Sequence, residues 1–302
     1  MYTNESLRGY LRKAQELGIP EPVTNWMLQL ARPRVVLHRD GDFRFGSGPA
    51  AATAPIVGFV GGNPLLPDNV EWNGFPHFIA SVDCGALPPD VLDFPFPHNG
   101  TLLFFANAEQ PDFSTDEEDT CGRIVYIQPG TPTSERAPHE DFRPFLTERF
   151  PLRSEIVWTM PQHASPEYLQ LTGETRDLFD KYHGAQIGNE PWPYCGQLAL
   201  GGHVAVVQSH PLERLMPDDI ELFDGEGNPH EMATAAATRR PEDLPLPHFP
   251  DLPMPDAEWV TIAEMTDDLK WGPPISTTYW SVRRVDLAEQ RFDRVKYHID
   301  IM

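Results

Sequence analysis

The chain has 302 residues and a formal net charge of −22, from 45 acidic and 23 basic side chains. This charge disfavours binding to nucleic acids and anionic membranes, because phosphate contacts need clustered Lys and Arg. Hydrophobic residues make up 40% of the chain, which is enough for a buried core, and the three cysteines include no CxxC pair.

The hydropathy of the sequence predicts neither export nor insertion into a membrane. The start, MYTNESLRGYLRK, lacks the apolar segment of a secretory signal. No apolar run approaches the roughly 18 residues that cross a bilayer. We therefore expect a cytoplasmic protein with reduced, buried thiols and no cofactor.

Residues 1–33 predict two helices. Within residues 4–17, leucines and alanines recur on one stripe, and Gly18 with Pro20 ends the pattern. A second helix is expected to begin at Pro22 and to bury Val23, Trp26, Met27 and Leu30.

From residue 34 the pattern changes to short runs of β-branched and aromatic residues, which predict strands. A proline-rich connection follows residue 84, and a second proline-rich segment spans 239–256. Helical pieces are expected after Ser165, over 174–183, and at 286–290 with Asp286 as the cap. The expected strands span residues 34–40, 75–84, 100–107, 122–128, 155–160, 258–265, 276–284 and 292–301.

Two diglycines, Gly61-Gly62 and Gly201-Gly202, stand 140 residues apart, each after an apolar run. Glycine inside a strand costs roughly 0.5–1 kcal/mol against alanine, so the pairs predict positive-φ corners where strands pack closely. Similar strand runs follow each pair in the same order. We therefore expect one mostly β, α+β domain over 1–302, with residues 34–160 as the first half and 161–302 as a helical insert plus the duplicated second half.

Three stretches resemble signatures of the YwqG-like bacterial proteins of unknown function. They are GGNPLLPDNVEWNGFPHFIASVD from Gly61, LGGHVAVVQSHP from Leu200, and EWVTIAEMTDDLKWGPPISTTYWSVRRVDLAEQRFDRV from Glu258. The resemblance implies a roll-like fold with an internal duplication, but no established reaction. Ser81 and Glu264 stand where that family usually has Gln, and Val204 where it has Pro. The residues that carry the structural motif are Gly61, Gly62, Pro64, Pro67, Trp72, Gly201, Gly202 and Gly272.

Strand ends supply the candidate ligand-binding residues. Gln208, Ser81 and Glu264 occupy equivalent positions and can form a polar cluster with Trp271 at a cleft between the halves. A buried amide can equally hydrogen-bond the backbone of a neighbouring loop. His203 follows the second diglycine, where it is either a base or ligand, or a packed residue.

Metal-binding and catalytic patterns are weak. Asp267 and Asp268 can hold a cation or cap a turn, and the acidic loop 112–119 lacks the spacing of an EF-hand. No nucleophile elbow, phosphate loop, HExxH or GxGxxG is present, and Cys84 and Cys195 are either nucleophiles or inert buried thiols. We expect no catalytic residue and no bound metal.

Two functions follow. The first is a non-catalytic acidic module that binds a basic protein, in an accessory or immunity-type role that the family resemblance implies. The second is a small-ligand-binding protein or enzyme with a pocket between the two halves. A flat acidic face favours the first, and a cleft with converging polar groups favours the second.

Overall fold

The fold is known from a computed structural model. The described residues are 5–16, 18–39, 54–107, 122–142, 148–161, 176–177, 179–180, 198–204, 211–212, 258–266 and 276–301. Gln208, Trp271, Gly272, Asp267, Asp268, the acidic loop 112–119, Cys195 and the segment 239–256 lie outside them. So do residues 165–175 and 181–183 of the expected helical pieces.

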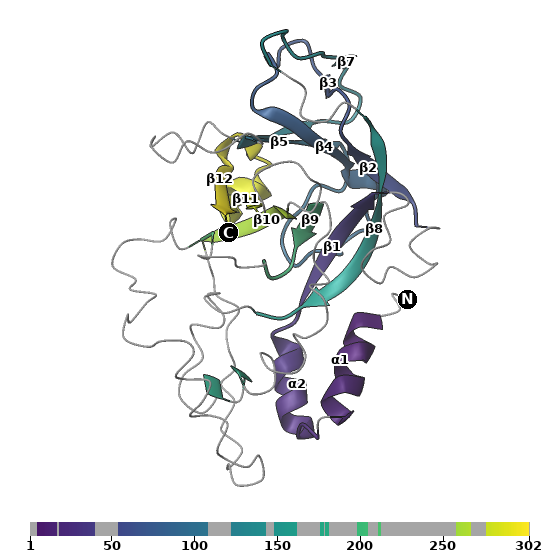
Figure 1. The fold of residues 1–302 in the computed structure, drawn as a ribbon, viewed down its shortest axis with the longest axis vertical. Coiled ribbons are helices and arrows are strands. Elements are labelled where there is room, and N and C mark those ends of the chain that lie inside the picture. The colour runs from purple at the N-terminus through teal and green to yellow at the C-terminus, as the bar shows by residue number, and fades with distance from the viewer. Residues whose placement is uncertain are drawn as a thin grey trace, which may run out of the picture.

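Two helices precede the sheet, as predicted. Helices α1 (Glu5–Glu16) and α2 (Glu21–Gln29) lie side by side below the strands (Figure 1). Gly18 has a φ of +64°, and the amide of Ile19 donates to the carbonyl of Ala14, a hydrogen bond that ends α1. The helices share a buried cluster with the end of a long strand: Tyr10, Ala14, Ile19, Val23, Trp26, Met27, Leu30, Met160 and Phe179.

Within the described residues, one antiparallel sheet contains ten strands, in the order β12-β11-β10-β9-β1-β8-β2-β4-β5-β6. The long strands β1 and β8 are its central pair, joined over the whole length of β1 (Figure 1). The order outward from β8 is β2, β4, β5, β6, and outward from β1 it is β9, β10, β11, β12. The strands are β1 (Arg32–Arg39), β2 (Ile56–Val60), β4 (His77–Asp83), β5 (Thr101–Ala106), β6 (Gly122–Ile127), β8 (Phe150–Thr159), β9 (Leu198–Gly201), β10 (Trp259–Thr266), β11 (Ser276–Arg283) and β12 (Lys296–Ile301).

The sheet curls until its two edges approach each other, so it is nearly closed. Trp280 on β11 donates from Nε1 to the carbonyl of Phe105 on β5 at 3.3 Å. A Cβ at Gly122 on β6 would lie 2.1 Å from Cδ2 of Tyr297 on β12, so only glycine permits this approach. The enclosed side chains form the main core, in which Phe104 and Trp280 pack edge to face at 5.4 Å.

A small two-stranded sheet covers the outer face of β4, β5 and β6. Strands β3 (Leu65–Leu66) and β7 (Ser134–Glu135) pair with each other, and Leu66 packs with Phe78 and Phe105 in a separate cluster. Trp72 closes this cluster, with its ring 6.0 Å from that of Phe105 and its Nε1 donating to the carbonyl of Pro76. Strands β3 and β7 lie at the top of Figure 1.

Both diglycines are positive-φ corners, as predicted. Gly61 and Gly62 each have a φ of +73°, and Gly201 and Gly202 have φ values of +66° and +70°. Each second glycine faces an arginine of the neighbouring strand region. A Cβ at Gly62 would lie 3.0 Å from Cβ of Arg149, and one at Gly202 would lie 2.6 Å from Cβ of Arg34.

Three expected boundaries were wrong. Strand β8 begins at Phe150 rather than at Glu155, because Pro151 is accepted in the strand opposite Phe59. Strand β12 begins at Lys296, since Phe292–Arg294 form a 3-10 turn. Asp286 is inside helix α6 (Arg284–Ala288) instead of capping it, and its carboxylate accepts from Nε of Arg283 at 2.8 Å.

The corner geometry predicts that valine lowers stability more at Gly202 than at Gly62. Gly202→Val adds a clash with Arg34 and Thr159 to the strain of a positive φ, so we expect a loss of about 2–5 kcal/mol. Gly62→Val is expected to lose less, because its nearest contact, Cβ of Arg149, is at 3.0 Å, whereas at Gly202 the two nearest atoms are at 2.6 and 2.7 Å. Thermal unfolding measures both.

The control is Gly130→Val, where φ is +77° and no atom lies within 4 Å of the new Cβ. This variant reports backbone strain alone, about 1–2 kcal/mol. Equal melting temperatures for all three variants would refute the role of close packing at Gly202.

Candidate functional site

The corner at Gly201-Gly202 lies on a buried ion pair. Arg34 on β1 meets Glu264 on β10 through two hydrogen bonds, at 2.7 Å from Nη2 to Oε1 and at 3.2 Å from Nη1 to Oε2. The side chains are 1% and 2% exposed. Nη1 also donates to the carbonyl of His203 at 2.8 Å, so one guanidinium ties the corner to two strands.

His203 is tied into the backbone around this corner. Its amide donates to Oγ1 of Thr159 at 2.7 Å, and that hydroxyl donates to the carbonyl of Arg32. The ring atom Nε2 lies 2.7 Å from the carbonyl of Leu30, at the end of α2. Since a carbonyl only accepts, Nε2 carries the proton in this contact, and the imidazole joins the sheet to the helices.

A row of buried polar side chains continues across β10, β11 and β12. Glu264 is opposite Tyr279, and Tyr279 is opposite His298, whose ring stacks on the tyrosine at 5.9 Å. Nε2 of His298 contacts Oδ1 of Asp300 at 3.1 Å. Burial, with Glu264 and Asp300 nearby, raises the pKa of Tyr279 above its usual value, so its phenol stays protonated.

The predicted ligand-binding residues do not gather at one place. Glu264 and His203 meet through Arg34, whereas Ser81 lies on β4, with β9, β1, β8 and β2 between it and β10. Gln208 and Trp271 lie outside the described residues. A ligand-binding role for these five residues stays a prediction.

The prolines of the first motif accept backbone hydrogen bonds near strands β3 and β7. The carbonyl of Pro64 accepts from the amide of Arg136, and that of Pro67 accepts from the amide of Val70. Together with Trp72, they position the outer cluster around Leu66.

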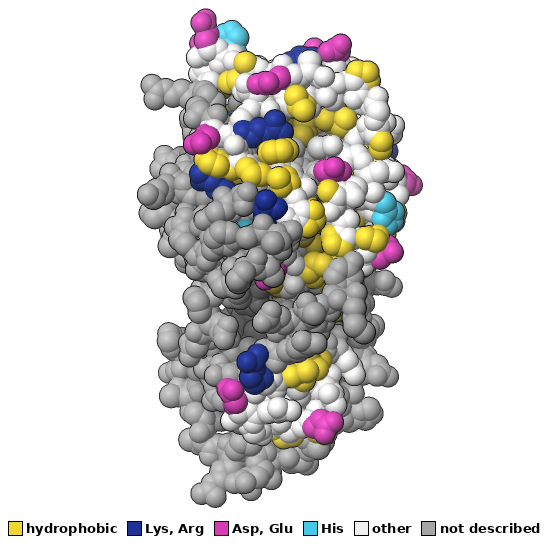
Figure 2. Space-filling view, turned by 90° about the vertical axis from the view of Figure 1, so that its right-hand side faces the viewer, with side chains coloured by type: hydrophobic (Ala, Val, Ile, Leu, Met, Phe, Trp, Pro, Cys, Tyr) yellow, Lys and Arg dark blue, Asp and Glu magenta, His cyan; other side chains and the backbone are white. Residues whose placement is uncertain are grey.

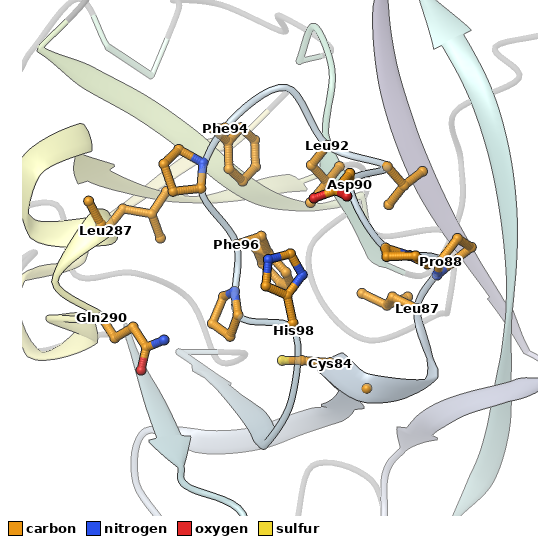
Figure 3. Close-up of a pocket in the computed structure, with 16 residues that line it drawn as sticks. Cys84, Leu87, Pro88, Asp90, Leu92, Phe94, Phe96, His98, Leu287 and Gln290 are labelled. Atoms are coloured by element: carbon orange, nitrogen blue, oxygen red, sulfur yellow. The ribbon is translucent and has the colours of Figure 1, made fainter.

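A cavity of about 420 Å³ lies elsewhere, between the connection from β4 to β5 and the end of α6 (Figure 3). Most of its lining side chains are apolar, whereas polar and apolar atoms share its surface almost equally, and polar side chains come from Asp90, His98 and Gln290. The lining residues are Cys84, Gly85, Leu87, Pro88, Pro89, Asp90, Val91, Leu92, Phe94, Pro95, Phe96, Pro97, His98, Leu287, Ala288 and Gln290.

The connection 84–99 is fixed at its base and at its far side. The amide of Cys84 donates to the carbonyl of Gly100 at 3.0 Å, and the hydroxyl of Tyr126 donates to the carbonyl of Asn99 at 3.2 Å. Across the loop, Asp93 accepts from Nε and Nη2 of Arg32 at 2.5 and 3.1 Å. These contacts hold in place the loop that forms the cavity wall.

Gly201 links the cavity to the diglycine corner. A Cβ there would lie 2.7 Å from Cδ2 of Leu92 and 3.2 Å from Cε1 of Phe94. Both side chains line the cavity, and Phe94 is buried in the main core. The second diglycine therefore admits the loop that makes the cavity as well as the arginine behind it.

The thiol at the cavity, that of Cys84, is held in its protonated form. Burial, followed by the nearby charge of Asp83, raises the pKa of Cys84 to about 12, so the thiol is protonated at neutral pH. Within the described residues, no hydrogen bond joins the side chains of Cys84, Asp90 and His98. A thiolate–imidazole pair is therefore not formed among them.

Among the described residues, no group of three or more His, Cys, Asp or Glu side chains is arranged to hold a metal ion. The two cation sites that the sequence left open, at Asp267-Asp268 and at 112–119, fall outside these residues.

Sequence reasoning missed the cavity. The prolines of the connection predicted only an irregular segment, and the contact with α6 bridges some 190 positions of the chain. One available signal was the cluster of Phe94 and Phe96 among prolines, which is unusual in a solvent-exposed loop.

A comparison with known families identifies the family of this chain. The profile of a domain of unknown function, DUF1963, matches residues 58–300. The chain belongs to the DUF1963 family. A search of curated proteins found no match. In the parts of this DUF1963 protein that the structure describes, every helix is too short or too polar to cross a membrane.

The buried ion pair gives a prediction for stability. Glu264→Leu leaves the guanidinium of Arg34 without its bidentate partner, and breaking a buried pair costs about 3–5 kcal/mol. We expect denaturant unfolding to show this loss.

The matched control is Glu258→Leu, which removes an exposed carboxylate that lies 3.7 Å from Arg283. An exposed pair contributes about 1 kcal/mol or less. The two variants losing the same stability would contradict a structural role for the Arg34–Glu264 pair.

Proposed function

We propose that this DUF1963 protein is a non-catalytic small-molecule-binding protein whose ligand occupies the cavity between residues 84–98 and 287–290. The observation that carries the proposal is the cavity itself, about 420 Å³, lined mostly by apolar side chains together with the polar side chains of Asp90, His98 and Gln290. Ligand sites commonly have volumes of about 300–1,000 Å³ and a few polar groups among apolar side chains. The function agrees with the second prediction from the sequence, although the cavity is not at Glu264.

Rigidity supports a binding role. The loop of the cavity is anchored through Arg32 and Asp93, closed at Gly100, and packed through Phe94 into the core. A preformed wall lowers the ordering cost of binding, because few side chains must be immobilised when the ligand enters.

We further propose a YwqG-like roll that arose by internal duplication. The support is the strand order, which continues from each central strand through four further strands of matching chain order. A second support is that each positive-φ diglycine faces an arginine, Arg149 or Arg34. On this proposal β1 and β8 join the two sets of strands at the centre of the sheet, since β1 pairs with β9 and β8 with β2.

The acidic protein-binding role stays the second proposal, resting on the net charge of −22. On the described part of the face drawn in Figure 2, acidic side chains stand apart among basic and hydrophobic ones. A basic protein partner, a cytoplasmic location and the absence of nucleic-acid binding stay predictions from composition.

A pocket-filling variant tests the binding function. Ala288→Trp places an indole at the cavity wall, whereas Val285→Trp places it on the same helix at a residue that is 63% exposed and outside the lining. We expect a thermal-shift screen of small amphipathic compounds to find some that stabilise the wild type and Val285→Trp but not Ala288→Trp. A ligand at 100 times its Kd adds about 2.7 kcal/mol, a shift of roughly 5 °C.

Two results would contradict the proposal. One is a screen in which no compound stabilises the wild type. The other is a set of compounds that stabilise all three proteins equally, because their site would then lie away from residue 288.

A further inference from the structure

We propose that the cavity selects a small cationic amphiphile, an amine with an apolar or aromatic body, whose ammonium group lies at Asp90. This inference rests on the proposed binding function and adds the chemical class of the ligand. It comes from the distribution of charge around the cavity.

The charge of the lining is one-sided. Asp90 is the one carboxylate among the lining residues, all of which the structure describes, and no Lys or Arg is among them. The nearest basic side chain of the loop anchor, Arg32, is neutralised by its two contacts with Asp93. An anionic head group therefore meets repulsion from Asp90 without a compensating cation, while an ammonium group meets attraction.

The backbone at Asp90 is held in a defined turn. Asp90 has a φ of +53°, a conformation that side chains other than Asn and Asp adopt rarely. It is followed by lining residues Val91 and Leu92, and Leu92 packs against Gly201. The turn therefore keeps the Cα of Asp90 at the cavity wall.

The remaining walls define the body of the ligand. Phe94 and Phe96 pack edge to face, with ring centroids 6.2 Å apart, and Leu287 adds an aliphatic side chain from α6. In Figure 3, Asp90 and Gln290 lie on opposite sides of the cavity, with Phe96 and His98 between them. An elongated molecule with an apolar body and one charged end matches this arrangement.

Three probes with the same body separate charge from shape: 4-phenylbutan-1-amine, 4-phenylbutan-1-ol and 4-phenylbutanoate. Calorimetric titration at pH 7 is expected to give a Kd for the amine about tenfold below that of the butanoate, because attraction and repulsion at an exposed carboxylate are each worth a few-fold. The alcohol should fall between them.

The variant Asp90→Asn keeps a side chain that tolerates positive φ and removes the charge. It should reduce the ratio of the two Kd values to less than about threefold, and leave binding of the alcohol unchanged. The control Glu289→Gln removes an equally exposed charge next to the lining residue Ala288, and the ratio should stay at its wild-type value. Thermal unfolding of both variants verifies that the fold is intact.

The outcomes separate this inference from the binding function. If the alcohol binds as tightly as the amine, or if the preference for the amine persists in Asp90→Asn, the cation site at Asp90 is wrong while the cavity remains a ligand site. If none of the probes binds but the compound screen yields ligands that Ala288→Trp excludes, the class of ligand is wrong. If both experiments find nothing, both proposals are refuted.

Discussion

The guanidinium of Arg34 is the point on which the arrangement of the sheet depends. It belongs to a central strand, pairs with a carboxylate 230 positions away on β10, and binds the carbonyl that follows the diglycine corner. Desolvating two such charges is costly, so the pair adds little net stability compared with apolar residues. Its effect is on specificity, because a shifted register between β1, β9 and β10 would leave both charges buried without partners.

The same corner connects this pair to the cavity. Gly202 gives room to Arg34, and Gly201 gives room to Leu92 and Phe94 of the loop that forms the cavity wall. The two adjacent glycines thus allow close packing of two separate neighbours, the arginine and the cavity loop. A side chain at either position would displace the arginine or the loop, which is why positive-φ glycines occur here rather than Asn or Asp.

Local patterns predicted much of the fold. The β-branched and aromatic runs give the strands, the apolar stripe gives α1 and α2, and the diglycines give positive-φ corners, because these features depend on short-range sterics and periodicity. The site could not be read in this way. Arg34 gave no sign of its distant partner Glu264, and the cavity depends on the approach of α6 to the β4–β5 connection. The start of β8 was predicted too late because prolines are rare in internal strands, yet Pro151 lies within this one.

The central proposal is that a ligand binds in the cavity between residues 84–98 and 287–290, and hydrogen–deuterium exchange tests it most directly. With 4-phenylbutan-1-amine bound, exchange should slow in peptides that cover residues 84–98 and 284–290, and stay unchanged in strands β3 and β7. Slower exchange confined to β3 and β7 or to α1 and α2, with none at the cavity, would contradict the account.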